Sequence, residues 1–343
     1  MIELKTPRGL SVRVPEWREE DPSPKFSPDD GKGIGAYYEQ NGYVVVEGLF
    51  RPETCDRMRE LWDAEIKPSD RFIYRQATAK AERHVFNARK WIMNPILNLQ
   101  SVDPRRYPEF RRFATEEVLA SGRLSTVFRT LLGGENPKIV QSMYFEGNSA
   151  TWEHQDSYYL DSEKVGAMAA AWIALEDITV KAGRFFVCPG SHRIDLGKQG
   201  MANNIADNHE VYIQQVVGKI AEQKLEIRAP ALQKGDVLFW NAWTIHGSLD
   251  SHDPDHPRSS ITCHAIPESQ RLLQLQSRIM PLNLASVHGI KIHRPKDLGQ
   301  IASRIVFGLE TRFPRAFYAG KKLAIRTLMR VKQRRREKAG IVT

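Results

Sequence analysis

The chain has 343 residues, of which 41% are hydrophobic, and this suits one large globular domain with extensions or two small domains. Its longest apolar run, 165–175, is too short to span a bilayer and favours a buried strand. The net charge is +9, but residues 301–343 hold twelve Lys or Arg and only two Glu, so the remainder is nearly neutral. This distribution excludes a uniformly basic nucleic-acid-binding protein.

The compartment is indicated by the N-terminus and the cysteines. The first residues, MIELKTPRGL, lack the apolar core of a secretion signal, so we expect a cytoplasmic protein. Cys55, Cys188 and Cys263 lie far apart and include no C-x-x-C pair. This usage favours buried apolar residues over a disulfide framework or a zinc site.

Helices dominate the expected structure before residue 137. Residues 1–30 are rich in proline and charge and predict an irregular arm. The β-branched segment YVVV at 43–46 predicts a strand. Apolar spacing and stop signals predict helices over 33–41, 52–66 and 107–132.

From residue 138 the pattern changes to short apolar strands between turn signals. Strands are expected over 138–145, 165–175, 184–187, 237–240 and 259–266. Several short strands with frequent turns predict an all-β barrel or sandwich. The polar segment 190–230 lies between these strands, and we expect it to form a lid that determines the substrate.

An H-x-D pattern carries the first chemical signal. In an extended strand, residues i and i+2 point to the same side, so His154 and Asp156 can bind one ion. His246, which follows the apolar strand VLFW, is the best third ligand; His252 and His256 are rivals that no strand precedes. Two imidazoles and one carboxylate form the facial triad of non-heme Fe(II) oxygenases, which leaves room for 2-oxoglutarate and O2.

Arg258 lies twelve residues after His246. A planar guanidinium that binds a carboxylate through two parallel hydrogen bonds is what the distal end of 2-oxoglutarate requires. Taken alone, Arg258 is equally well explained as a solvated loop arginine. Together with the triad, it favours a binding site for 2-oxoglutarate.

The sequence resembles the phytanoyl-CoA dioxygenase family over residues 35–270, with weak similarity at 65–137. The matching segments are VQSMYF (140–145), HQD (154–156), AAWIALEDI (170–178), GRFFVCPGSH (183–192), KGDVLFW (234–240), IHGS (245–248) and Arg258 with SSITCHAI (259–266). The resemblance implies a mainly β fold with helical decoration, built on a double-stranded β-helix (jelly-roll) core. It also implies Fe(II), 2-oxoglutarate and O2 as cofactor and co-substrates.

The resemblance also implies residue roles. It assigns the metal ligands to His154, Asp156 and His246. It assigns the cofactor contacts to Arg258, Ser248, Met143 and Trp172, with Gln141 as a further pocket-lining position. Gln155, as the middle of the HQD motif, and the flanking residues Trp152 and Tyr158 are candidates for the substrate pocket, with packing as their alternative.

The resemblance implies hydroxylation of an organic small molecule, with succinate and CO2 as co-products. Desaturation and ring formation use the same centre and stay open. One alternative is a non-catalytic β-barrel binding module whose basic tail contacts a membrane or an acidic partner. Another is a cupin-like metal enzyme without oxoglutarate, which would need neither Arg258 nor Ser248.

Three parts are expected: the arm 1–30, a dioxygenase domain 31–270, and a basic helical extension 271–343. In the tail 301–343, apolar residues recur at near-helical spacing among Arg and Lys, and Pro314 and Gly320 should interrupt any long helix. Such a helix can lie on an anionic membrane or bind an acidic partner. Its alternative is a solvated helix packed on the β-core. Nucleic-acid binding is not expected, because no recognised module accompanies the charge.

Overall fold

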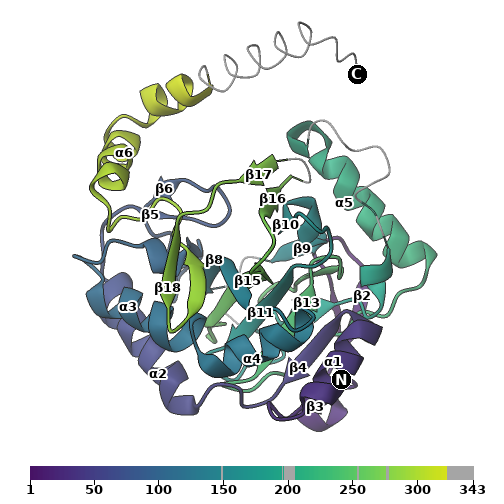
Figure 1. Ribbon diagram of the computed structural model, residues 1–343. Coiled ribbons are helices and arrows are strands. Elements are labelled where there is room, and N and C mark those ends of the chain that lie inside the picture. The colour runs from purple at the N-terminus through teal and green to yellow at the C-terminus, as the bar shows by residue number, and fades with distance from the viewer. Residues whose placement is uncertain (148–149, 195, 197–204, 253–254, 276–277, 323–343) are drawn as a thin grey trace, which may run out of the picture.

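The structure is a computed structural model that describes residues 1–147, 150–194, 196, 205–252, 255–275 and 278–322 (Figure 1). Its main feature is a large, mostly antiparallel sheet. In spatial order this sheet contains β18 (Leu284–Val287), β19 (Ile290–His293), β8 (Pro137–Phe145), β15 (Ser260–Pro267), β11 (Ala169–Ala174), β13 (Val237–Asn241), β4 (Tyr43–Val46) and β3 (Lys25–Phe26), and β7 (Ile96–Leu97) pairs with β8.

A smaller sheet faces the large one and carries two of the predicted metal ligands. It has the order β12 (Phe185–Val187), β14 (His246–Ser248) and β9 (Thr151–His154). The remaining strands form short ribbons: β1 (Ile2–Lys5) with β2 (Ser11–Val14), β5 (Ile73–Tyr74) with β6 (Ala81–Glu82), and β10 (Leu160–Ser162) with β16 (Leu272–Gln274) and β17 (Arg278–Met280).

The central strands of the large sheet are buried on both faces, and their side chains alternate between two cores. On β11, Ala171 and Ile173 pack on the helical side, whereas Ala170 and Trp172 pack toward Phe185 of the small sheet. The helical side is covered by α1 (Gly31–Asn41), α2 (Pro52–Leu61), α3 (Pro108–Phe113) and α4 (Gly122–Leu131) (Figure 1). The helices cover only one face of the large sheet, so the other, inner face can contribute side chains to a site between the two sheets.

The predicted helices are present, with local breaks. The helix expected over 33–41 is α1, which ends at Gly42 in the left-handed conformation (φ +75°). The one expected over 52–66 is α2 followed by a π-helical turn, 62–66. The one expected over 107–132 is divided into α3, a second π-helical turn and α4.

The segment 190–230, expected as a polar lid, contains a long helix, α5 (Ile205–Glu222). Its apolar side chains Tyr212, Ile213, Val216 and Ile220 are buried in a core of their own. Residues 195 and 197–204 of this segment lie outside the described residues. The helix packs beside β9, so it supports the strand that carries His154.

The expectation of an irregular arm over 1–30 is wrong for its first half. Residues 2–14 form the β1–β2 hairpin, because Val12 and Val14 alternate with polar residues and are buried against Phe186 of the small sheet. Proline and charge masked this short period-2 pattern in the sequence.

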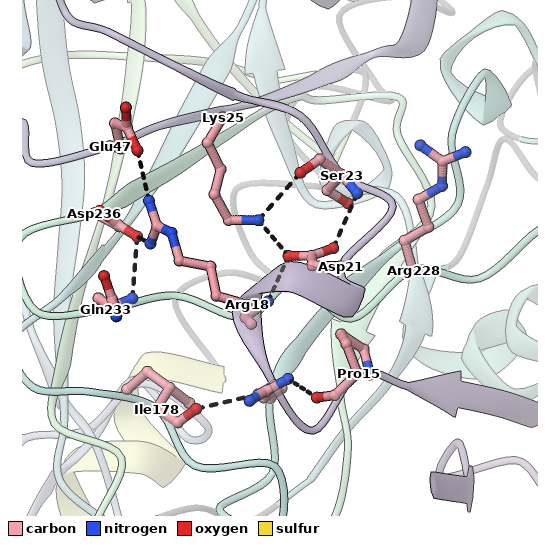
Figure 2. Close-up of polar contacts among 12 residues, drawn as sticks. Pro15, Arg18, Asp21, Ser23, Lys25, Glu47, Ile178, Arg228, Gln233 and Asp236 are labelled. Carbon is pink, nitrogen blue, oxygen red and sulfur yellow. Dashed lines mark hydrogen bonds and ion pairs between the residues drawn. The ribbon is translucent and has the colours of Figure 1, made fainter. Parts of the chain in front are cut away.

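Ion pairs fix the second half of the arm to the domain (Figure 2). Arg18 bonds Asp236 and Glu47, each at 2.6 Å. Asp21 accepts hydrogen bonds from Lys25 at 2.6 Å and from the backbone N–H of Ala231 at 2.7 Å. The arm is therefore anchored to the loop before β13 rather than extended into solvent.

The C-terminal extension begins with β16–β19 and continues into α6 (Ile301–Arg312). The chain breaks at Phe313, is helical again over 314–322, and passes through Gly320 without the expected interruption. Residues 323–343 of the predicted tail lie outside the described residues. Among the described helices, none combines the length and apolarity that crossing a bilayer requires.

Candidate metal centre

The three predicted metal ligands meet between β9 and β14. His154 and His246 are direct partners across these strands, and their ring centroids are 4.2 Å apart. β9 ends at His154, and the extended Gln155 (φ −111°, ψ 132°) returns Asp156 to the same side. Nε2 of His154 and Nε2 of His246 lie 3.7 and 3.6 Å from Oδ1 of Asp156. The three potential ligand atoms lie within 4.8 Å of one another.

Backbone carbonyls fix the tautomer of both histidines. Nδ1 of His154 lies 2.8 Å from the carbonyl oxygen of Trp152, and Nδ1 of His246 lies 2.9 Å from that of Thr244. A carbonyl can only accept, so each Nδ1 carries a proton and each Nε2 is the nitrogen that can bind a metal. Burial also lowers the pKa of His154, which favours its neutral form. Both rings are therefore prepared to bind a cation.

Asp156 is held by two residues that the sequence analysis did not identify as part of the site. Its Oδ2 accepts a 2.8 Å hydrogen bond from Nε1 of Trp240, and Nε2 of His264 lies 3.3 Å away. Burial alone would raise the pKa of Asp156, but the neighbouring His246 and His264 hold it well below its ordinary value. The carboxylate is therefore ionised, with Oδ1 directed at the two ligand histidines.

Strand register explains this arrangement. Trp240, Ala170, His264 and Gln141 are successive partners across β13, β11, β15 and β8, so their side chains form one row on the inner face. The small Ala170 between two large rings leaves space above the sheet. The carboxylate of Asp156 enters this space from the opposite sheet.

This donor set fits a divalent transition metal. Two imidazole nitrogens and one carboxylate oxygen converge from one side, and this is the 2-His-1-carboxylate arrangement that suits non-heme Fe(II). The described ligand group contains His246, as predicted, and neither of its rivals His252 and His256.

Arg258 is a buried cation that lies among rings and carbonyls. Its side chain is almost inaccessible, with the residue 2% exposed, and one terminal nitrogen donates to the carbonyl of Gly183 at 2.8 Å. The guanidinium carbon lies 5.6 Å from the ring centre of Phe145 and 5.7 Å from that of Trp172. Among the residues that the structure describes, no carboxylate forms an ion pair with it, and burial lowers its pKa to about 9. A buried cation without an anion is costly, so this pocket favours a bound carboxylate.

Aromatic rings connect the triad to the predicted cofactor residues Trp172 and Arg258. The ring of Phe185 lies 5.4 Å from that of His246 and 6.1 Å from that of Trp172, which in turn borders Arg258. Two further predicted residues belong to the same inner face. Met143 and Trp172 both pair with Thr262 of β15, and Ser248 follows His246 on β14 and accepts a hydrogen bond from the N–H of Thr151.

Two of the three residues predicted for the substrate pocket have structural contacts instead. The amide of Gln155 donates to the carbonyls of Ile194 (2.8 Å) and Trp243 (2.7 Å), so it is already used. Tyr158 is buried and stacks on Tyr212, with 3.7 Å between ring centres. Trp152 remains 39% exposed beside the H-x-D segment, so it alone of the three keeps a surface for a ligand.

Similar proteins were found by sequence. The sequence profile described as Phytanoyl-CoA dioxygenase (PhyH) matches residues 38–259. Phytanoyl-CoA dioxygenase domain-containing protein 1 of Mus musculus is 28% identical over 263 residues, covering 66% of this chain and 87% of that protein. Peroxisomal phytanoyl-CoA dioxygenase of Homo sapiens is 24% identical over 244 residues, or 66% of each chain.

Several solved structures have a fold similar to that of this chain. The non-heme alpha ketoglutarate dependent carbocyclase SnoK from nogalamycin biosynthesis has a TM-score of 0.51 and 18% identity, covering 70% of this chain and 85% of that one. EctD from S. alaskensis, solved with 2-oxoglutarate and 5-hydroxyectoine, also has a TM-score of 0.51, with 19% identity over 82% of this chain and 93% of that one. The expected jelly-roll core is thereby confirmed. With the profile matching more than half of its length, the chain belongs to the phytanoyl-CoA dioxygenase family.

Proposed function

We propose that this protein is an Fe(II)- and 2-oxoglutarate-dependent oxygenase that hydroxylates an organic small molecule, with succinate and CO2 as co-products. The observation that carries the proposal is the buried guanidinium of Arg258, which pairs with no carboxylate of the described residues and lies on the same inner face as the His154–Asp156–His246 group. A non-catalytic barrel has no use for this pair of features. A metal enzyme without oxoglutarate has no use for Arg258.

The roles of the residues follow from their placement. His154, Asp156 and His246 would hold Fe(II), which supplies the chemistry that activates O2 when oxoglutarate is bound. Arg258 binds the distal carboxylate of oxoglutarate as a charge-assisted partner, and Ser248, which lies on β14 two residues after His246, is a second contact for it. The rings of Phe185 and Trp172 exclude water from the space between.

An anaerobic titration with Fe(II) and 2-oxoglutarate tests the proposal. We expect a visible charge-transfer band that requires both small molecules, is absent in Asp156→Ala, and needs far more oxoglutarate in Arg258→Gln. Arg112→Gln is the control, because Arg112 pairs with Glu109 and Glu116 on an exposed helix surface. A folded wild-type protein that forms no band would exclude the oxygenase.

We also propose that α6 docks the protein on an anionic membrane surface. The helix packs on the domain through Phe307 and the buried Glu310, and no described residue covers its other face. That face has an apolar stripe at intervals of four residues, formed by Ile301 (69% exposed), Ile305 (60%), Leu309 (50%) and Phe313 (56%). Exposed cations lie at the end of α6 and in the helical segment that follows it, and they are Arg312, Arg315, Lys321 and Lys322. A basic amphipathic surface of this kind suits anionic lipid.

We also propose a division of the chain into parts and a compartment for the protein. The parts are the arm 1–30, the dioxygenase domain 31–270 and the extension 271–343, and both the arm and the extension contact the central domain. The cytoplasm is the proposed compartment, and it is compatible with a peripheral membrane contact.

A further inference from the structure

A cavity of about 440 Å³ lies between the central domain and the C-terminal extension. The domain contributes residues of β5, the segment 97–107 and β8 to its wall, and the extension contributes residues of β16, the segment 293–298 and α6. A cavity of this volume can enclose a small organic molecule. A molecule bound there would contact both parts of the chain.

The buried part of the cavity wall is apolar. Val140 of the domain and Leu272 and Leu298 of the extension line the cavity and are buried. Phe307 of α6 meets Tyr74 of β5 edge to face, with 5.4 Å between ring centres, and both rings belong to the wall. An ion that entered this interior would lose its hydration, which is costly. The interior therefore favours an uncharged molecule.

The cations that line the cavity are already paired. Their nitrogen–oxygen distances to carboxylates are 3.1 Å for Arg71 with Asp70, 3.8 Å for Arg106 with Asp103 and 4.0 Å for Lys296 with Glu310. All three cations are exposed, so these pairs form the rim of the cavity and not its interior. Because each positive charge has a negative partner, the rim does not select an ion over a neutral molecule.

Two carboxamides can provide hydrogen bonds inside the cavity. Gln141 of β8 and Gln274 of β16 line it from the domain and from the extension. Both residues are half-buried, and no described residue accepts or donates a hydrogen bond to either side chain. A carboxamide donates and accepts without carrying charge. These two side chains therefore suit neutral polar groups such as a hydroxyl, an amine N–H or a carbonyl.

We propose that this cavity binds an uncharged, mostly apolar small molecule that carries one or two neutral hydrogen-bonding groups. Such a ligand would join the domain to the extension and hold α6 against it. None of the described metal ligands His154, Asp156 and His246 lines the cavity. The inference therefore goes beyond the proposed oxygenase function and does not depend on it.

The test uses two fluorescent probes that share one body and differ in charge. N-phenyl-1-naphthylamine is neutral and has one N–H group, whereas 8-anilino-1-naphthalenesulfonate adds an anionic group to the same rings. Both are titrated into full-length, metal-free protein, and their emission rises in apolar surroundings. We expect the neutral probe to bind at least about tenfold more tightly than the anion, because only the anion must lose the hydration of a charge.

Variants locate the binding. Thr311→Trp on α6 and, independently, Leu97→Trp on β7 place a large ring in the cavity from opposite sides, and each should weaken the neutral probe at least about tenfold. Leu284→Trp is the control, because Leu284 is exposed on β18 and lies outside the lining of the cavity.

Gln141→Leu tests the hydrogen bond. Loss of one neutral hydrogen bond should weaken the neutral probe about threefold. Gln214→Leu is its control, because Gln214 lies on the exposed surface of α5, where it bonds Glu210.

Hydrogen exchange tests the effect on the extension. The neutral probe should slow the exchange of backbone amides in α6 of the wild type and leave that of Thr311→Trp unchanged. Three outcomes overturn the proposal: the anion binds as tightly as the neutral probe, both cavity tryptophan variants keep the affinity of the wild type, or α6 exchanges at the same rate with and without the probe. All these measurements use metal-free protein, so failure of the Fe(II) and 2-oxoglutarate titration would reject the oxygenase and leave this result intact.

Discussion

The indole Nε1 of Trp240 donates a 2.8 Å hydrogen bond to Oδ2 of Asp156, and this contact determines which carboxylate oxygen faces the two histidines. Trp240→Phe keeps the ring and removes the donor. The carboxylate can then rotate, so we expect metal affinity to fall roughly 10- to 100-fold, the usual effect of losing such an outer partner. Calorimetric titration with Co(II) or Mn(II) measures this change.

Trp62→Phe is the matched control for that experiment. Trp62 is equally buried but stacks on Tyr144 in the helical core, with 3.9 Å between ring centres. Its replacement should leave metal affinity unchanged. Unchanged affinity in a folded Trp240→Phe variant would show that the indole does not orient the ligand.

The sequence predicted the metal ligands but not the residues that orient them, for a physical reason. His154 and Asp156 are two positions apart in an extended segment, so their convergence is a local property. Trp240 and His264 reach Asp156 only because β13, β11 and β15 pair in one particular register. No local pattern specifies that register.

The same distinction explains the errors in the fold. The predicted core strands have strong apolar runs and appear within a few residues of their expected bounds, although β11 begins only at Ala169, after the turn at Gly166. Helix α5 was missed because its polar surface outweighed the buried Tyr212, Ile213, Val216 and Ile220. These residues lie at positions i, i+1, i+4 and i+8, and this spacing is typical of the buried face of a helix.

Arg258→Met should remove oxoglutarate binding without destabilising the ligand-free protein. The variant replaces a buried cation, which has no anionic partner in the described part of the chain, with an apolar side chain, so the free energy of unfolding should stay equal or rise by about 1 kcal/mol. With Mn(II) present, oxoglutarate should raise the melting temperature of wild type only. Thermal melts with and without oxoglutarate check both effects.

Arg184→Met is the control for that experiment, because it removes a buried arginine that is not expected to bind oxoglutarate. Arg184 is also buried, but its guanidinium donates to the carbonyls of Pro15 and Ile178, which anchors the N-terminal arm. We expect this variant to lose stability and to keep its response to oxoglutarate. A ligand-free Arg258→Met that loses as much stability as Arg184→Met would argue that Arg258 is a structural residue.

The surroundings of His84 predict that the folded protein loses stability in acid. Its Nε2 donates to the carbonyl of Ile66 and its Nδ1 accepts from Arg75, so a second proton would face the guanidinium. Burial, and then the charge of Arg75, lower the pKa of His84 to about 4. The folded state thus binds fewer protons than the unfolded state between pH 4 and 6.5, and stability is lost as pH falls through this window.

Urea unfolding at pH 7.5, 6.5 and 5 measures this effect. Because His84 is partly exposed, we expect its share of the loss between pH 6.5 and 5 to be about 1 kcal/mol. His84→Gln should lose that share, whereas the exposed His288→Gln should retain it. A pH dependence identical in His84→Gln and wild type would assign the lability to other groups.

The exposed stripe of α6 predicts binding to anionic vesicles. Leu309→Glu and Ile305→Glu each place a charge in the stripe. Burying one large aliphatic side chain contributes about 1.5–3 kcal/mol. Each variant should therefore lower the fraction of protein that sediments with phosphatidylcholine–phosphatidylglycerol vesicles by about tenfold. Leu284→Glu changes an exposed apolar residue on β18 and should have no effect. Salt should weaken binding, because the flanking cations contact the lipid headgroups. If wild type stays in the supernatant at low salt, the stripe is not a membrane surface, and an acidic protein partner becomes the hypothesis to test.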